Sequence, residues 1–141
     1  MMKTSTRRVT GFSLIELMIV VVIIAILAAL AMNSYRQYVL RGNRTSATRA
    51  LQDLTSREEN YYYSNNAYAQ TLSSLGATGS MAGPYYTVVV VPAATSSTYQ
   101  VQATPVGTQV QDTTCGTFTL TREGVQNITG TGTVANCWQG Q

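Results

Sequence analysis

An apolar segment close to the amino terminus limits what this chain of 141 residues can fold into. Between Phe12 and Met32 the only charged residue is Glu16, and nearly all of the remaining residues are aliphatic. At about 1.5 Å of rise per residue, a helix of this length spans the hydrocarbon core of a bilayer, which is roughly 30 Å thick. The segment is therefore predicted to be a membrane-spanning helix.

Glu16 is the feature of this segment that an ordinary membrane span does not explain. An acidic residue near the bilayer centre costs about 2.5 to 3.5 kcal/mol, so a buried Glu16 needs a partner. If the residue instead lies at the end of the span, at the level of the headgroups, it needs none. The apolar pattern alone leaves both possibilities open.

The residues around Glu16 resemble the processing motif of the type IV pilins, in which Gly11-Phe12 is followed by a glutamate and an unbroken apolar run. The resemblance implies that a prepilin peptidase cuts after Gly11, methylates the new amino terminus at Phe12 and leaves the helix attached. It also implies that Glu16 is the assembly glutamate, neutralised by the Phe12 amine within or between subunits. Such a buried pair sets register more than it adds stability.

The resemblance also divides the chain into three parts. Residues 1–11 are a predicted leader peptide, and its three basic residues predict a cytoplasmic location. Residues 12–35 are the predicted transmembrane and filament-core helix, and residues 36–141 are the predicted globular domain. An ordinary secretory signal, cut near Ala28 to Ala31, is the alternative, but Gly11 and Glu16 are not expected in it.

Charge and composition exclude several functions. After Gly11, six arginines balance six acidic residues, so nucleic acid is not an expected partner. The chain has no histidine and no lysine beyond the leader, which removes the common catalytic triads and the phosphate-binding loop. We therefore predict that the protein is not an enzyme and has no cofactor. Without histidine or a second cysteine pair, we also expect no metal site.

An amphipathic helix is predicted to continue the span to about Tyr61. Its apolar positions keep helical spacing, and they are Ala47, Ala50, Leu51 and Leu54. Many pilins have glycine where this chain has Ala25 and proline where it has Asn33. Since glycine and proline weaken helices, we predict a helix that melts less easily between Ala25 and Asn33 in a filament.

Charged residues along this helix are predicted to form solvated faces. Beyond the span lie Arg36, Arg41, Arg44 and Arg49. We expect them to face water or acidic lipid headgroups, or alternatively to pair with acidic residues of a neighbouring subunit. Glu58 and Glu59 are adjacent on a helix, so they do not face each other, and we expect them to be solvated.

The rest of the chain predicts a small antiparallel sheet. Strands are expected over 84–92, 98–104 and 116–121, with a shorter one over 125–129. Tyrosines between 61 and 68 are expected to end the helix and to pack it on the sheet, rather than to form an aromatic binding platform. A loop should then run to about Gly83. The fold class is therefore α+β, with the type IV pilin arrangement of a long amino-terminal helix packed against the sheet.

Cys115 and Cys137 are the only cysteines, and both lie on the predicted exterior side. An even cysteine count in an exported chain favours a disulfide. Closing a loop of about twenty residues with a disulfide stabilises a domain by about 3 kcal/mol. The segments that begin at Cys115 and Cys137 also resemble the carboxyl-terminal region of PilE-like pilins.

The resemblance implies a PilE-like, minor pilin, a structural subunit of the fimbriae that serve cell adhesion and twitching motility. Its expected partners are other pilin subunits in a helical filament, the prepilin peptidase, the pilus assembly platform and a motor ATPase. Before assembly it is expected in the inner membrane with a periplasmic domain, and afterwards in the extracellular pilus. The alternatives are a pseudopilin of a type II secretion system and a pilin used in DNA uptake.

Overall fold

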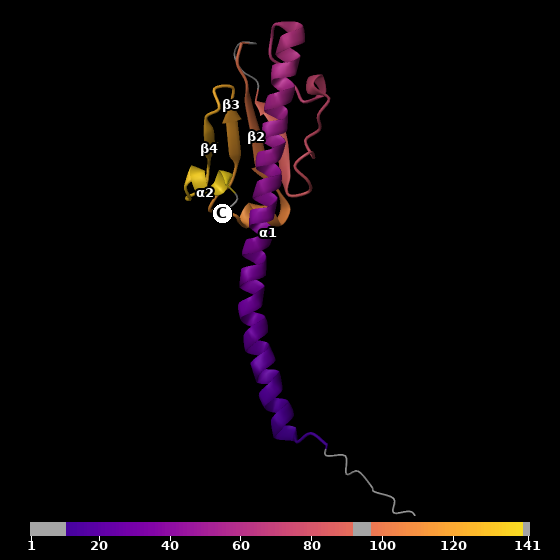
Figure 1. Ribbon diagram of the computed structural model, residues 1–141, viewed down its shortest axis with the longest axis vertical. Coiled ribbons are helices and arrows are strands. Elements are labelled where there is room, and N and C mark those ends of the chain that lie inside the picture. Colours follow the sequence, from indigo (N-terminus) through magenta and orange to yellow (C-terminus); the bar gives the residue numbers. More distant parts are fainter. Residues whose placement is uncertain (1–10, 92–96, 140–141) are drawn as a thin grey trace, which may run out of the picture. The chain divides into compact units, whose positions relative to one another are not determined.

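The computed structural model describes residues 11–91 and 97–139. Its elements are the helix α1 (Leu14–Asn65), the 3-10 turn η1 (Ser73–Leu75), the strands β1 (Tyr86–Val91) and β2 (Gln100–Pro105), the turn η2 (Gly107–Gln111), the strands β3 (Phe118–Thr121) and β4 (Gln126–Ile128), and the short helix α2 (Val134–Trp138) (Figure 1). The chain separates into two compact units between Gln37 and Tyr38.

The first unit holds the apolar part of α1. This helix is long and apolar enough to cross a membrane, with a mean hydropathy of 3.1, and none of the apolar window is buried. Large apolar side chains from Phe12 to Met32 are each at least 45% exposed. The helix continues through Ala25 without a break. This confirms the predicted apolar helix in the free subunit, while its behaviour in a filament stays a prediction.

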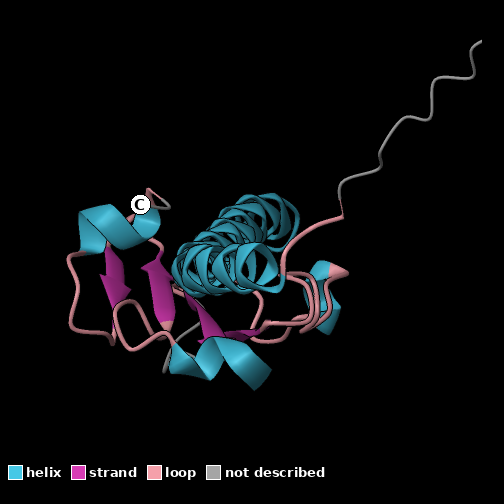
Figure 2. Cartoon of the chain, turned by 90° about the horizontal axis from the view of Figure 1, so that it is seen from below, coloured by secondary structure: helices cyan, strands magenta, loops and turns pink. Residues whose placement is uncertain are grey.

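In the second unit, one side of α1 packs on one face of the sheet (Figure 2). Ala47, Ala50, Leu51 and Leu54 are all buried, as their helical spacing predicted. The sheet contributes Tyr86, Val88, Val90, Val101, Ala103, Phe118 and Leu120 to this core. Because successive strand residues point to opposite faces, burial in β1 alternates with a period of two.

The sheet has four antiparallel strands in the order β1-β2-β3-β4. The register places Val88 opposite Ala103, and Val101 opposite Leu120, which stacks buried residues across the sheet. All four predicted strands are present, although each is shorter than predicted. The predicted end of the first strand, at residue 92, lies outside the described residues.

The structure differs from the sequence prediction at the end of α1 and in three short elements. The helix ends at Asn65 rather than Tyr61, because Asn66 adopts a left-handed conformation with φ of 51°. The two 3-10 turns and α2 were not predicted, since they are too short for a periodic signal. Helix α2 begins after Thr133, whose hydroxyl accepts a hydrogen bond from the Asn136 N–H at 3.3 Å.

Candidate assembly and processing site

The predicted cleavage position lies just before α1. Gly11, Phe12 and Ser13 are not helical, and Phe12 is 79% exposed. Ser13 caps the helix, because its hydroxyl accepts a hydrogen bond from the Glu16 N–H at 3.3 Å. This cap was not predicted, although the spacing of Ser13 and Glu16 matches a capping box and could have revealed it.

Glu16 is exposed in the first turn of α1. Within the described residues its carboxylate makes no ion pair. Its acidic side chain is favourable near the positive end of a helix dipole. The role of Glu16 in assembly therefore stays a prediction that needs a partner outside the single chain.

Cys115 and Cys137 form the expected disulfide, with Cα atoms 5.7 Å apart. Both cysteines are buried, and the bond joins α2 to the loop before β3. The neighbouring backbone segments are bonded to each other, since the Gly130 N–H donates to the Cys115 carbonyl at 3.0 Å. A side chain at Gly130 would collide with the Thr114 carbonyl, so this close approach requires glycine.

A buried ion pair attaches α1 to the loop that contains η2. The Arg44 guanidinium donates two hydrogen bonds of 2.7 Å to the Asp112 carboxylate, and both side chains are at most 5% exposed. Gln109 is fully buried beside them and donates to the Tyr86 hydroxyl at 3.2 Å. Burial of Tyr86 raises its pKa to about 12. The Cys115 N–H donates to Asp112 as well, so the network reaches the disulfide.

This network corrects the predicted series of solvated arginines. Arg36, Arg41 and Arg49 are exposed, as predicted, but Arg44 is buried against Asp112. The reason is the position of Arg44 on the side of α1 that packs on the domain. Its partner lies 68 residues away in the sequence, so helical periodicity carried no signal for the pair.

Glu58 corrects a second prediction, because it is fully buried rather than solvated. One of its carboxylate oxygens accepts a hydrogen bond of 2.8 Å from the Ala69 N–H, and the other has no hydrogen-bond partner among the described residues. Glu59 is exposed, as expected, and accepts a hydrogen bond from the Tyr68 hydroxyl at 3.2 Å.

The tyrosines near the end of α1 mostly serve packing, as predicted. Tyr68 and Tyr99 are buried, and their ring centroids lie 4.8 Å apart. The Arg122 guanidinium lies 5.3 Å from the Tyr68 ring centroid and also donates to its hydroxyl at 2.8 Å. Tyr62 is 39% exposed but stacks on the Tyr68 ring, whereas Tyr63 is 91% exposed and is the exception. Burial raises the pKa of Tyr99 to about 12.

Comparisons with known proteins also point to the type IV pilins. A profile for the type IV minor pilin ComP, a DNA uptake sequence receptor, matches residues 33–119, and one for the prokaryotic N-terminal methylation motif matches residues 6–32. Among solved structures, the chain is similar to a type IV pilin from Shewanella oneidensis, with 28% identity and a TM-score of 0.51. That match covers 62% of this chain and 89% of the other. No curated protein matches.

Proposed function

We propose that this chain, which belongs to the type IV minor pilin ComP family and is a subunit of a type IV pilus, is made as a precursor. The precursor is cut between Gly11 and Phe12, and the mature chain assembles through α1. The family and the fold are structural. The matched proteins are pilins, which is why we prefer a pilus to the pseudopilus of a type II secretion system.

The observation that carries this proposal is the uncovered apolar surface of α1. Every large apolar residue from Leu14 to Met32 is exposed in the single chain. Lipid covers this surface before assembly, and the same part of sibling subunits covers it in the filament, so it stays out of water throughout. Since both environments are apolar, the energy for extraction comes from outside the subunit, from a motor ATPase acting through the assembly platform.

Processing prepares the helix for this transfer. The bond between Gly11 and Phe12 precedes the helix and is exposed, so a membrane peptidase can reach it. Cleavage creates an amine at Phe12, and methylation keeps its positive charge. That amine neutralises the Glu16 carboxylate of its own or a neighbouring subunit. The basic leader keeps the cut end cytoplasmic, which places the globular domain in the periplasm before assembly.

Two substitutions separate processing from assembly. Gly11→Leu should leave uncut precursor in the membrane, whereas Glu16→Gln should be cut and then enter filaments poorly. Glu16→Asp, which keeps the charge, is the matched control and should assemble better than Glu16→Gln. Immunoblots of membranes and sheared filaments give both readouts. Normal incorporation of Glu16→Gln would contradict the charge pairing.

A second candidate function is DNA binding during uptake, which the description of the matched family favours. Arg41 and Arg49 are exposed on α1 and make no ion pair within the described residues. The balanced charge of the chain after Gly11 weighs against this candidate, and nucleic acid was not an expected partner. We therefore rank it below the structural role.

A gel shift with the full chain in detergent tests DNA binding. If two arginines contact phosphates, the logarithm of the affinity should fall with the logarithm of salt concentration with a slope of roughly −1.8. Arg49→Gln should reduce that slope, while Gln52→Ala, a neutral change on the same helix, should not. If no salt-sensitive binding were observed, DNA binding would be ruled out and the structural role would be the one function proposed.

A further inference from the structure

Nothing within the subunit explains why residue 42 is a glycine. It lies inside α1, where glycine is less favourable than alanine. Its backbone is ordinary helix, and an added Cβ would meet no atom within 4 Å among the described residues. Neither a left-handed conformation nor a close internal contact therefore requires glycine here. A contact from outside the subunit would require it.

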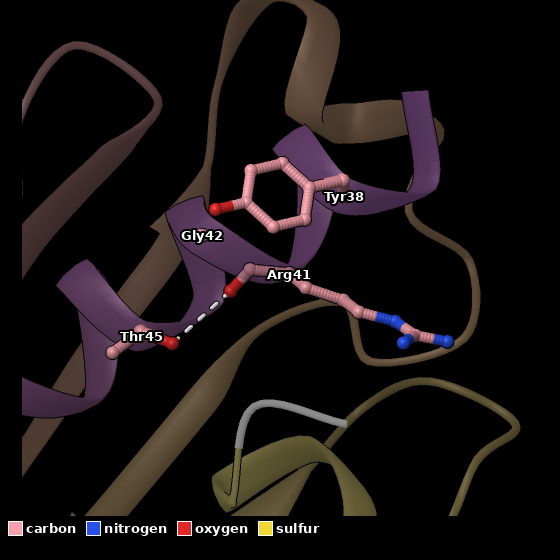
Figure 3. Close-up of a pocket in the computed structure, with 4 residues that line it drawn as sticks. All are labelled: Tyr38, Arg41, Gly42 and Thr45. Carbon is pink, nitrogen blue, oxygen red and sulfur yellow. Dashed lines mark hydrogen bonds between the residues drawn. The ribbon is translucent and has the colours of Figure 1, made fainter. Parts of the chain in front are cut away.

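A hollow of about 380 Å³ lies on the helix surface at Gly42 and is lined by Tyr38, Arg41, Gly42 and Thr45. We call this hollow the Gly42 notch. Figure 3 shows the Tyr38 ring lying along the helix beside Gly42, while the Arg41 side chain extends away from the helix. Thr45 closes the far end, where its hydroxyl donates to the Arg41 carbonyl at 3.2 Å. The notch thus combines an aromatic wall with a cation.

The notch has one charged residue, Arg41, and its guanidinium has no ion-pair partner among the described residues. Arg41 is exposed and makes no ion pair within the described residues, in contrast to Arg44 and Arg57. Tyr38 is 76% exposed. Glu123 is also exposed and forms no ion pair there, so a second copy of the chain offers a carboxylate of the kind that Arg41 binds.

We propose that the Gly42 notch receives a side chain of a neighbouring pilin subunit in the filament, with Arg41 paired to a carboxylate of that neighbour. This inference rests on the proposed function, because it extends along α1 the subunit contact that the apolar segment makes. Tyr38 follows Met32, the last residue of that segment, by only six positions in the sequence, so a sibling subunit that covers the segment comes close to the notch. Glycine at residue 42 lets the neighbour approach the helix backbone.

The proposal predicts opposite effects on the subunit and on the filament. Gly42→Ala should raise the Tm of the full chain in detergent by roughly 2 to 4 °C, because alanine is the better helix former at an exposed position. Gly42→Leu should fold, be processed normally and yet appear in sheared filaments at roughly one tenth of the wild-type amount. Arg41→Gln should also reduce incorporation, and Arg41→Lys should restore part of it.

Gln52→Leu is the matched control for added bulk. Gln52 is exposed on the same helix, roughly 80° around its axis from Gly42 at 100° per residue. Wild-type incorporation of Gly42→Leu, or a lower Tm for Gly42→Ala, would overturn the proposal. If Arg41→Gln left filaments unchanged but reduced binding to phosphatidylglycerol vesicles, the notch would serve lipid instead. Absence of the wild-type chain from filaments would refute the proposed function itself.

Discussion

At the scale of single residues, the pair of Arg44 and Asp112 is a buried ion pair that joins α1 to the loop containing η2. Both charges are buried, so each depends on the other for the hydrogen bonds that water no longer supplies. Asp53 and Arg57 form the other ion pair of the described chain, but both side chains are more than 40% exposed. The two pairs should therefore differ widely in their contribution to stability.

Asp112→Ala should lower the free energy of unfolding by about 3 to 5 kcal/mol, because it leaves the Arg44 charge buried without a partner. Asp53→Ala, the control in the exposed pair, should lower it by only about 0.3 to 0.5 kcal/mol. Urea unfolding of the full chain in detergent measures both. The double variant Arg44→Met/Asp112→Leu should lose less than Asp112→Ala alone. Equal losses at the two pairs would contradict the buried network.

Glu58 makes stability depend on pH. Burial raises the pKa of this carboxyl above 4.5, the Ala69 N–H opposes the rise, and the charge of Glu59 adds to it. A group whose pKa is higher in the folded chain binds more protons there, so stability falls as the pH rises above 4.5. The wild-type chain should therefore become more stable relative to Glu58→Gln as the pH is lowered from 7 to 4.5.

The control for this pH dependence is Glu123→Gln, which should show the opposite sign. Hydrogen bonds to its own backbone and to Thr121 lower the pKa of Glu123, so its contribution to stability is lost as the pH falls below 4.5. Urea midpoints at pH 7 and pH 4.5 measure the Glu58 difference, and midpoints at pH 4.5 and at lower pH measure the Glu123 difference. A difference between wild type and Glu58→Gln that does not change with pH would contradict the raised pKa of Glu58.

At the scale of secondary-structure elements, α1 combines two roles in one helix. Its apolar part is exposed on all sides, while its later part buries one face on the sheet and leaves Arg41 and Gly42 on the surface. The helix has no glycine or proline between Leu14 and Arg41. Breaking it would therefore require loss of ordinary helical hydrogen bonds without a residue that favours the break.

Helix α1 should remain unbroken between Ala25 and Asn33 in the assembled filament. Asn33→Pro should introduce a kink or a melted turn there, since proline costs about 3 kcal/mol inside a helix. Density from electron cryo-microscopy shows whether the helix is continuous in filaments of the wild-type chain and of Asn33→Pro. An unwound segment in the wild-type filament would contradict the prediction.

At the scale of the whole molecule, local patterns in the sequence predicted the order of the main elements. The apolar run, the period of two in the strands and the two cysteines each act over short stretches. Partners outside one helix or strand could not be predicted: Arg44 binds Asp112, which is 68 residues away, and the buried Glu58 carboxylate accepts a hydrogen bond from the Ala69 N–H in the loop after α1. The Gly42 notch was also missed, because a glycine in a helix is informative only once its surroundings are known.

The central claim is that the chain loses its leader at Gly11 and keeps α1 for assembly. Amino-terminal sequencing and intact-mass measurement of the subunit from sheared filaments test this claim most directly. We predict a chain that begins at Phe12, carries one added methyl group and retains the disulfide between Cys115 and Cys137. A chain that begins beyond the apolar segment, or that still carries residues 1–11 in the filament, would contradict it.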